Sequence, residues 1–378
     1  MIESLALEEK LLLILARRSP PALKEYIEDQ CKSLGYATRV DGERIFRLAL
    51  RNGVAPLVYL GVKDSGLFSE EVLAWFRNSY LATVASNLLK AAEIVRIIQA
   101  LGERVIEVIP LKGPVAAEKF FGSLGLYPSG DIDILVKQSR VPEVGAVLQE
   151  VGGYCSPEGV SQDDLLASHY HLIYCNSNQT VEVHWNLVKR YFDIPSSFWW
   201  EGVRQGVFDN TQINELEPEK YLLYTIFRLF DHQFAPLKFL VLVAEQINSQ
   251  SDIDWGKLSG YAERYGLILL VQFVLKLARE LLDARIPESV INVQITGYGL
   301  LKRMVLREVT NERTNPHLKM FVFSCFLLPP AQLIRVLLGR LFPTASEIRL
   351  RYGIHERSLT VYFYYILNPF LLIFRRTR

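Results

Sequence analysis

The sequence predicts an α+β fold, in which a small mixed β-sheet lies between a helical N-terminal region and a large helical C-terminal region. Two observations predict the sheet: β-branched residues run from Val105 to Leu111, and apolar and polar side chains alternate in Asp131–Val136 and in Thr180–Trp185. The third observation predicts the helices. Apolar residues recur at helical spacing through much of the chain before the first strand, and nearly everywhere after Pro218.

We divide the chain into an N-terminal helical region (1–102), a core (103–200) and a C-terminal helical domain (201–378). In the N-terminal region the apolar pattern predicts helices over Glu3–Arg17, Leu23–Leu34, Gly42–Arg51 and Glu70–Gly102. In the core it predicts a short helix that Pro114 opens, a helix over Val141–Val151, and a hairpin of Tyr170–Tyr174 with Thr180–Trp185. The C-terminal helices are expected at Tyr221–Phe230, Leu237–Ile247, Trp255–Tyr265, Leu267–Leu282 and Leu300–Val309.

Asp131 and Asp133 lie two positions apart in a predicted strand, so their side chains point to the same face. Adjacent carboxylates raise each other's pKa, which favours a site where a cation binds between them. Mg²⁺ (or Mn²⁺) suits such a site because it takes carboxylate oxygens and binds substrate phosphates. By the same rule of alternation, Glu182 can supply a third carboxylate from a later strand. His184 shares its face, either as an accessory group or as a hydrogen-bonded structural residue.

A turn that can hold phosphate precedes the acids. Gly113 leaves room for a triphosphate to approach the backbone, and the helix that follows presents its positive end there. Lys112 either neutralises a phosphate oxygen or closes a surface turn, while Ser129 and Gly130 shape the entry to the second strand. Three acids around metal ions, next to such a turn, indicate phosphoryl or nucleotidyl transfer.

The same tripeptide occurs again at Asp252-Ile253-Asp254, where no strand pattern follows. There we expect a turn and a helix N-cap, since aspartate is favoured at that position.

The segments LKG, GDIDILV and VEVHW, which contain these residues, resemble the bacterial uncharacterised nucleotidyltransferase family, a branch of the polymerase-β-like superfamily. In this resemblance Asp131 and Asp133 match the Asp-x-Asp motif, Glu182 matches the third acid, and Lys112-Gly113 stands at the expected turn. The resemblance implies a nucleotidyltransferase core. It also implies an enzyme that moves a nucleoside monophosphate from a nucleoside triphosphate to a hydroxyl-bearing acceptor by two-metal-ion catalysis.

Two alternatives remain open, and two departures from the family pattern make the first of them plausible. Tyr127 stands where members usually carry an arginine, and Leu242 where an aspartate is expected. The first alternative is a catalytically degenerate protein that binds nucleotide without turnover. The second is a helical protein that contacts a partner or a membrane surface and whose core only resembles the enzyme.

Charge and cysteine usage set outer bounds. The chain has 378 residues with 42 Lys and Arg against 41 Asp and Glu, so a nucleic-acid acceptor is not favoured. A protein, a peptide, a sugar or another small molecule remains open as acceptor. The N-terminus is acidic and lacks a signal peptide, which predicts a cytoplasmic protein. Cysteines without metal-ligand spacing are expected to be buried thiols in a reducing compartment, namely Cys31, Cys155, Cys175 and Cys325.

The longest apolar run, Leu359–Phe374, is interrupted by Asn368-Pro369 and is shorter than the roughly 20 residues that cross a bilayer. It is expected to form a buried or dimer-forming helix or, alternatively, a peripheral membrane contact in which the arginines at 375–378 face anionic headgroups. Trp199-Trp200 is interpreted as core or as a stacking platform for a base or sugar.

Overall fold

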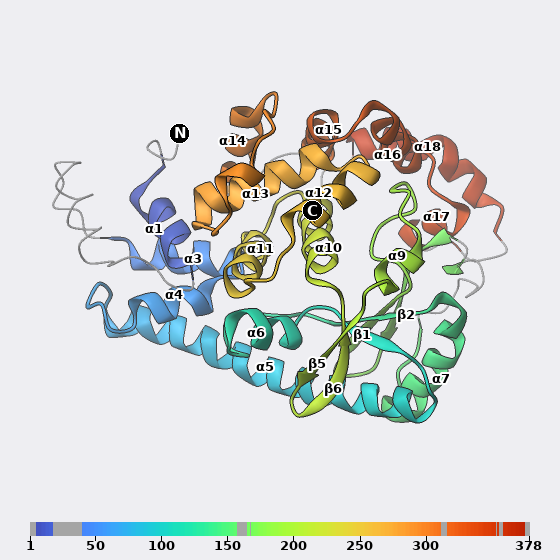
Figure 1. The fold of residues 1–378 in the computed structure, drawn as a ribbon, viewed down its shortest axis with the longest axis horizontal. Coiled ribbons are helices and arrows are strands. Elements are labelled where there is room, and N and C mark those ends of the chain that lie inside the picture. Colours follow the sequence, from blue (N-terminus) through green and yellow to red (C-terminus); the bar gives the residue numbers. More distant parts are fainter. Residues whose placement is uncertain are drawn as a thin grey trace.

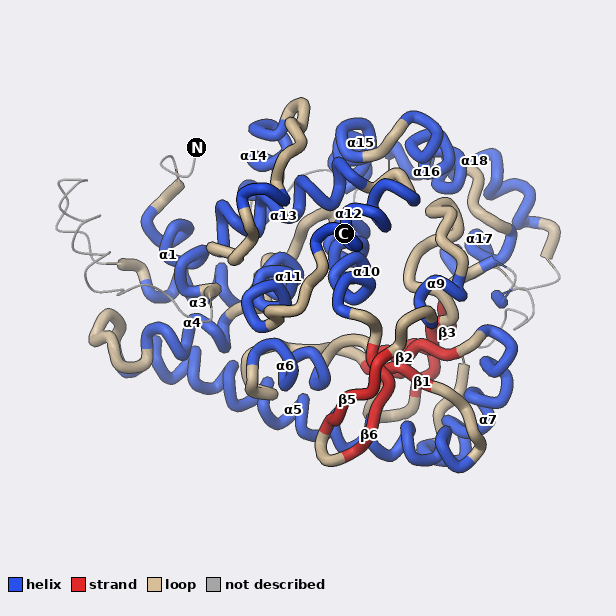
Figure 2. The backbone as a smooth tube through the Cα atoms, viewed as in Figure 1, coloured by secondary structure: helices blue, strands red, loops and turns tan. Residues whose placement is uncertain are grey.

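The computed structural model describes residues 5–17, 40–156, 165–166, 168–310, 316–352, 354 and 358–374. The predicted helix Leu23–Leu34, with Cys31, and the arginines at 375–378 lie outside the described residues. Strands gather in one region and helices surround them, which confirms the predicted α+β class (Figures 1 and 2).

The main sheet is mixed and has four strands in the order β1-β2-β4-β3. β2 (Ile132–Val136) pairs antiparallel with β1 (Val108–Pro110) and parallel with β4 (Thr180–His184), and β3 (His171–Cys175) pairs antiparallel with β4. The first strand is shorter than the sequence predicts, because the preceding helix continues to Glu103 and the chain then turns through Val105 at φ +55°. Asp131 precedes β2 rather than belonging to it.

A second, two-stranded sheet was not predicted. β5 (Arg204–Phe208) and β6 (Thr211–Glu215) form a hairpin whose two turn residues, Asp209 and Asn210, both have positive φ. Such a turn matches the twist of the flanking strands, and Asp-Asn is a residue pair that tolerates it. The Asn214 side-chain amide donates to the Val108 carbonyl at 3.2 Å, so β6 covers the outer side of β1.

One long helix, α5 (Glu70–Glu103), underlies much of the molecule (Figure 1). The Ser69 hydroxyl caps its start by accepting from the Val72 N–H. α5 packs against α4 (Ala55–Val62) and α6 (Pro114–Phe121) at one end and against α7 (Val141–Gly152) at the other. The remaining helices are α1 (Leu7–Leu15), α3 (Gly42–Arg51), α9 (Ser196–Trp200), α10 (Pro218–Asp231), α11 (Lys238–Ser249), α12 (Trp255–Arg264), α13 (Ile268–Leu282), α14 (Tyr298–Val309), α15 (Pro316–Leu327), α16 (Pro330–Leu341), α17 (Ala345–Tyr352) and α18 (Thr360–Phe374), with 3₁₀ turns η1 (Gln138–Arg140) and η2 (Glu288–Val290).

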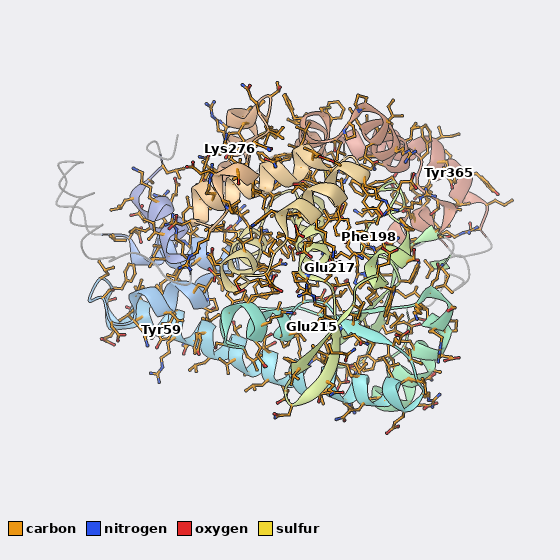
Figure 3. All side chains as sticks on the ribbon, viewed as in Figure 1. Tyr59, Phe198, Glu215, Glu217, Lys276 and Tyr365 are labelled. Atoms are coloured by element: carbon orange, nitrogen blue, oxygen red, sulfur yellow. The ribbon has the colours of Figure 1, made fainter. Side chains whose placement is uncertain are left out.

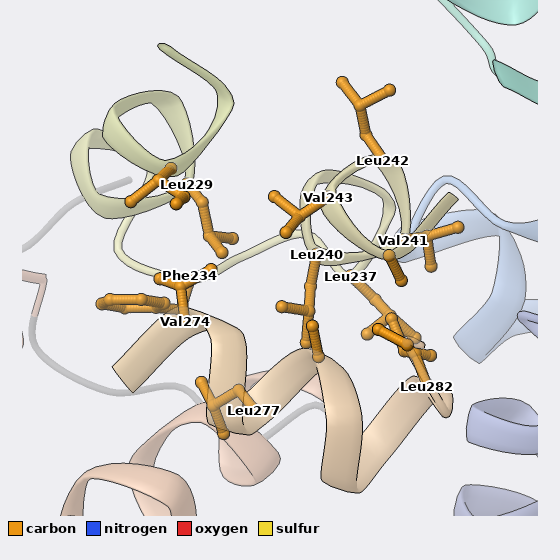
Figure 4. Packing of buried hydrophobic residues seen from close by; sticks show 14 of the residues in the cluster. Leu229, Phe234, Leu237, Leu240, Val241, Leu242, Val243, Val274, Leu277 and Leu282 are labelled. Atoms are coloured by element: carbon orange, nitrogen blue, oxygen red, sulfur yellow. The ribbon is translucent and has the colours of Figure 1, made fainter. Parts of the chain in front are cut away.

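Two apolar clusters form the core. The smaller lies around the sheet, α7 and the second half of α5, and the larger joins the N-terminal and C-terminal helices. Within the larger cluster, Leu240 on α11 faces Leu277 on α13, whereas Leu242 points to the opposite side of α11 (Figure 4). α10 lies at the centre and is buried over nearly its whole length. Glu217, directly before α10 (Figure 3), is buried and accepts from the Tyr261 hydroxyl at 3.1 Å.

Over residues 361–368, the part of α18 whose side chains are described, the helix is packed on one side only. Val361 and Asn368 are buried, and the Asn368 side-chain amide donates to the carbonyls of Arg340 and Leu341. Tyr362, Phe363 and Ile366 are exposed. No helix in the described part of the chain combines the length and the apolar character that crossing a bilayer requires.

The expected burial of the cysteines is wrong for Cys155, Cys175 and Cys325, which are exposed. Cys175 shows the physical reason. Side chains alternate along β3, so Leu172 and Tyr174 face the core while Ile173 and Cys175 face solvent. An apolar neighbourhood in the sequence therefore does not place a strand residue inside.

Asn52 ties three segments of the helical core together. Its buried side-chain amide donates to the carbonyls of Leu48 and Val309, and its side-chain oxygen accepts from the Leu237 N–H. Asn52→Ala should lower the free energy of unfolding by roughly 3 kcal/mol, because buried backbone groups lose their partners.

Urea denaturation monitored by circular dichroism measures this loss. Asp254→Ala is the comparison, because the Asp254 carboxylate caps α12 by accepting from the Lys257 N–H at 2.9 Å, as the sequence predicted. Loss of that exposed cap should cost only about 1 kcal/mol. Equal losses in the two variants would contradict the linking role of Asn52.

Candidate active site

The parallel pairing of β2 with β4 sets the central geometry. Asp133 lies directly opposite Glu182 in the register. Asp133 is buried, and the Glu182 side chain is 17% exposed. His184, two residues beyond Glu182, places its Nε2 atom 3.1 Å from Asp133 Oδ1 and 3.3 Å from Glu182 Oε2. One ligand atom from each of these three residues lies within 4.8 Å of the others.

Lys112 lies between the two aspartates. Its ammonium is 3.0 Å from Asp133 Oδ2 and 3.2 Å from Asp131 Oδ1. The sequence had assigned this lysine to phosphate or to a surface turn. In the structure it follows β1 and contacts the carboxylates, so it supplies a positive charge to the pair. Asp131 is joined to the other acids through Lys112 and is not itself in the group formed by Asp133, Glu182 and His184.

The two cations keep the acids charged. Burial alone would raise the pKa of Asp133, but Lys112 and His184 outweigh it and hold that pKa below its usual value. Burial likewise opposes ionisation of Glu182, yet the hydrogen bond from His184 lowers its pKa to about 2. Burial would lower the pKa of His184, but Asp133 and Glu182 raise it. The site therefore pairs two acids whose pKa values are lowered, Asp133 and Glu182, with Lys112 and with a histidine whose pKa is raised.

His171 places a neutral imidazole ring beside His184. It lies opposite His184 in the β3–β4 register, and the two rings stack with centroids 5.1 Å apart. Burial, together with the adjacent His184, lowers the pKa of His171 to about 3. His171 thus stays uncharged beside His184 and supports the orientation of its ring.

The glycine turn has a steric requirement of its own. Gly113 is the N-cap of α6 and has φ +68° and ψ −131°, a conformation open to glycine. A Cβ atom there would lie 2.8 Å from Ser129 Oγ. The Ser129 hydroxyl donates to the Asp131 carbonyl at 2.8 Å, which fixes the loop before β2 where it lies against Gly113. Gly130 is exposed and has open space around its Cα.

Sequence reasoning missed the helical residues that surround the site. The Tyr221 hydroxyl, on α10, donates to the Leu111 carbonyl and fixes the end of β1. Arg228, two turns further along the same face of α10, has a buried Nε without a hydrogen-bond partner, and its pKa is raised by Tyr224 and Asp133 against the opposing effect of burial. A single arginine within an apolar helical run was the available indication in the sequence. Arg228 lies far from Asp133 in the sequence, so their proximity in the fold could not be predicted.

Lys238 and Tyr127 occupy the region of the first family departure. Tyr127 is buried and stacks on Phe121, with ring centroids 5.4 Å apart. The Lys238 ammonium lies 5.7 Å from the Tyr127 ring centroid and donates to the Pro128 carbonyl at 3.0 Å. A cation from α11 therefore lies beside the loop that leads to Asp131.

The sequence profile of the uncharacterised nucleotidyltransferase family matches residues 38–283, which include every site residue above. The chain belongs to this family. Nucleotidyl transfer is accordingly the general activity that the family indicates, and the resemblance noted from the sequence motifs is confirmed.

Among solved structures, the antibiotic-resistance factor ANT(2'')-Ia matches 47% of this nucleotidyltransferase-family chain and 94% of its own, with 14% sequence identity and a TM-score of 0.35. A likeness this low carries no weight for the fold or the activity. No curated protein sequence is similar enough to count as a match.

The turn can be tested by comparing two glycines with similar positive φ. Gly113→Ala should lower the free energy of unfolding by roughly 3 kcal/mol, because it adds a steric clash with Ser129 to the backbone strain. Gly153→Ala has φ +64° and no atom within 4 Å of the added Cβ, so it should cost only about 1 kcal/mol. Chemical denaturation of both variants measures the difference. Similar losses would mean that the contact with Ser129 is easily relieved.

Proposed function

We propose that this protein transfers a nucleoside monophosphate from a nucleoside triphosphate to the hydroxyl group of an acceptor, with Mg²⁺ or Mn²⁺ held by Asp131, Asp133 and Glu182. The observation that supports this most strongly is the convergence of Asp133 and Glu182 at one register position of two parallel strands. Family membership supports the reaction type, and the cluster of Asp133, Glu182 and His184 supports the metal chemistry.

The donor set fits a hard divalent ion. Asp133 Oδ2 is buried and has no partner in hydrogen-bond geometry, although it pairs with the charge of Lys112. Carboxylate oxygens are the ligands that Mg²⁺ and Mn²⁺ prefer. The imidazole of His184 lies near enough to assist in binding the ion. Bound there, divalent ions supply Lewis-acid stabilisation of phosphate charge and lower the pKa of the acceptor hydroxyl.

Several cations suit the triphosphate. Lys90 is buried and donates to the Ser86 hydroxyl at 2.6 Å, while Lys238 donates to a carbonyl. Among the residues that the structure describes, neither these two lysines nor Arg228 forms a salt bridge, whereas each interacts electrostatically with Asp131 or Asp133. Basic side chains that no salt bridge neutralises, near a phosphate turn, favour a polyanionic substrate. The N-terminus of α6 at Gly113 adds backbone N–H groups for it.

In the proposed step the acceptor oxygen forms a bond to the α-phosphorus and releases its proton to water. The bond from the α-phosphorus to the bridging oxygen breaks, and pyrophosphate leaves with that electron pair. Lys112 is placed to neutralise charge on the phosphate once metal holds the carboxylates. Glu182 is a poor candidate for a general base, because its pKa lies at about 2.

A second candidate function is nucleotide binding without turnover. The salt bridges of Lys112 and His184 favour it, since they neutralise the carboxylates without metal. The remaining alternative is a helical interaction protein. It predicts that the acids lie apart, whereas in this structure they converge.

Asp133→Asn should lower metal-dependent release of pyrophosphate by roughly 10²-fold or more, because the variant loses a charge that the reaction needs in a buried position. A coupled assay for pyrophosphate with each nucleoside triphosphate and Mg²⁺ or Mn²⁺ measures the rate.

Asp252→Asn is the matched control, since Asp252 belongs to the other Asp-x-Asp tripeptide and pairs with Arg204 at 2.7 Å on the surface. It should retain full activity. Nucleotide binding by the wild-type protein without pyrophosphate release in any condition would instead support the second candidate function.

A further inference from the structure

A cleft of about 730 Å³ opens beside the proposed active site. Ser129 and Lys238 line its inner end, α5 forms one wall, and the α3–α4 segment forms the other. The Ser129 hydroxyl donates to the Asp131 carbonyl, so this end of the cleft adjoins the loop that carries Asp131. The volume is that of a pocket for one small molecule.

The α5 wall is a stripe of hydroxyl and amide groups. Its members recur at helical spacing and so share one face, namely Ser79, Thr83, Ser86 and Asn87. Asn87 is fully buried, and its amide nitrogen donates to the carbonyls of Leu124 and Tyr127. Its side-chain oxygen has no hydrogen-bond partner. A buried acceptor left open beside a cleft suits a ligand that brings a hydroxyl donor.

The cleft also has an apolar part. Phe46 and Pro56 from the α3–α4 segment and Trp75 from α5 line it, and the rings of Phe46 and Trp75 lie 5.7 Å apart at an interplanar angle of 44°. Tilted rings form a curved surface and not the flat slot in which a planar base stacks. Such a surface matches the C–H face of a saturated ring whose hydroxyl groups reach the hydroxyl and amide groups of α5.

We infer that this cleft binds the acceptor, and that the acceptor is a small hydroxyl-rich molecule of the sugar or cyclic polyol class. This inference rests on the proposed nucleotidyl transfer and narrows the acceptor to one chemical class. A protein acceptor would bind through a broad surface, since a stable protein interface buries about 1,000 Å² or more. A cleft of this volume instead suits one small molecule. One hydroxyl of the occupant would face the acids past Ser129.

Ala82→Trp tests the assignment, because Ala82 is exposed on α5 and lines the cleft, so a large side chain there fills the space without entering the core. Ala85→Trp is the matched control, since Ala85 is exposed one turn further along α5 and does not line the cleft. Asn78→Trp, at another exposed lining position, is a second filling variant in case the first does not fold.

The full-length variants are incubated with α-labelled nucleoside triphosphates, Mn²⁺ and a cell extract separated into dialysable and macromolecular fractions. Label should appear in the dialysable fraction on a hydroxyl-bearing product. Ala82→Trp should reduce the transfer of label to this product by roughly a hundredfold, whereas Ala85→Trp should not reduce it. Nucleotide affinity should be unchanged in both variants. The inference would be overturned by label in the macromolecular fraction, by undiminished transfer in both filling variants, or by a loss of nucleotide affinity in Ala82→Trp. The last result would mean that the cleft binds the nucleoside.

Equilibrium dialysis of the same proteins against the dialysable fraction separates this inference from the proposed function. If no label is transferred to any fraction, the proposed function fails. Retention of a sugar or polyol by the wild type and Ala85→Trp, but not by Ala82→Trp, would then still support the class of occupant. Equal retention by all three proteins would overturn it.

Discussion

The rest of this structure depends on one placement: a buried aspartate on β2 opposite a glutamate on the parallel strand β4. Two like charges in a low-dielectric interior are costly unless cations accompany them. Lys112 and His184 supply those charges from the end of β1 and from β4 itself. These charged groups are therefore positioned together by the short first strand, the turn at Gly113 and the hairpin of β3 with β4. The sheet needs few residues because its main role is to hold this electrostatic arrangement.

The helices keep this arrangement in place from two directions. α10 reaches the end of β1 through the bond from Tyr221 to the Leu111 carbonyl, and it carries Arg228 toward the acids. α5 supports the opposite side, where Asn87 holds the carbonyls of Leu124 and Tyr127 in the loop that leads to Asp131. The same helix forms a wall of the cleft. Small changes in the position of α5 would thus affect both the acid cluster and the cleft, since rigid packed elements move as units.

The sequence predicted what depends on local periodicity. Alternation along the strands was enough to bring Asp133, Glu182 and His184 to one face, and capping chemistry was enough to assign Asp254 to a helix start. It could not predict contacts set by tertiary packing. The partners of Lys112 depend on how β1 pairs with β2, and the approach of Arg228 depends on how α10 packs near the site, so neither follows from a nearby residue. The hairpin of β5 and β6 was missed for another reason: its Asp-Asn turn is a weaker indication than Asn-Gly.

The two departures from the family pattern have a structural explanation that bears on activity. Tyr127 and Leu242 are both buried in the apolar core, so neither leaves an uncompensated gap at the site. Positive charge near Tyr127 comes instead from Lys238, whose backbone N–H donates to the Asn52 carbonyl. Its side chain passes over Gly53, where a Cβ atom would lie 2.7 Å from Lys238 Cδ. A glycine at positive φ thus makes room for a lysine between the acids and the cleft. This argues that the chain supplies the positive charge of the missing arginine from a different element and has not lost it.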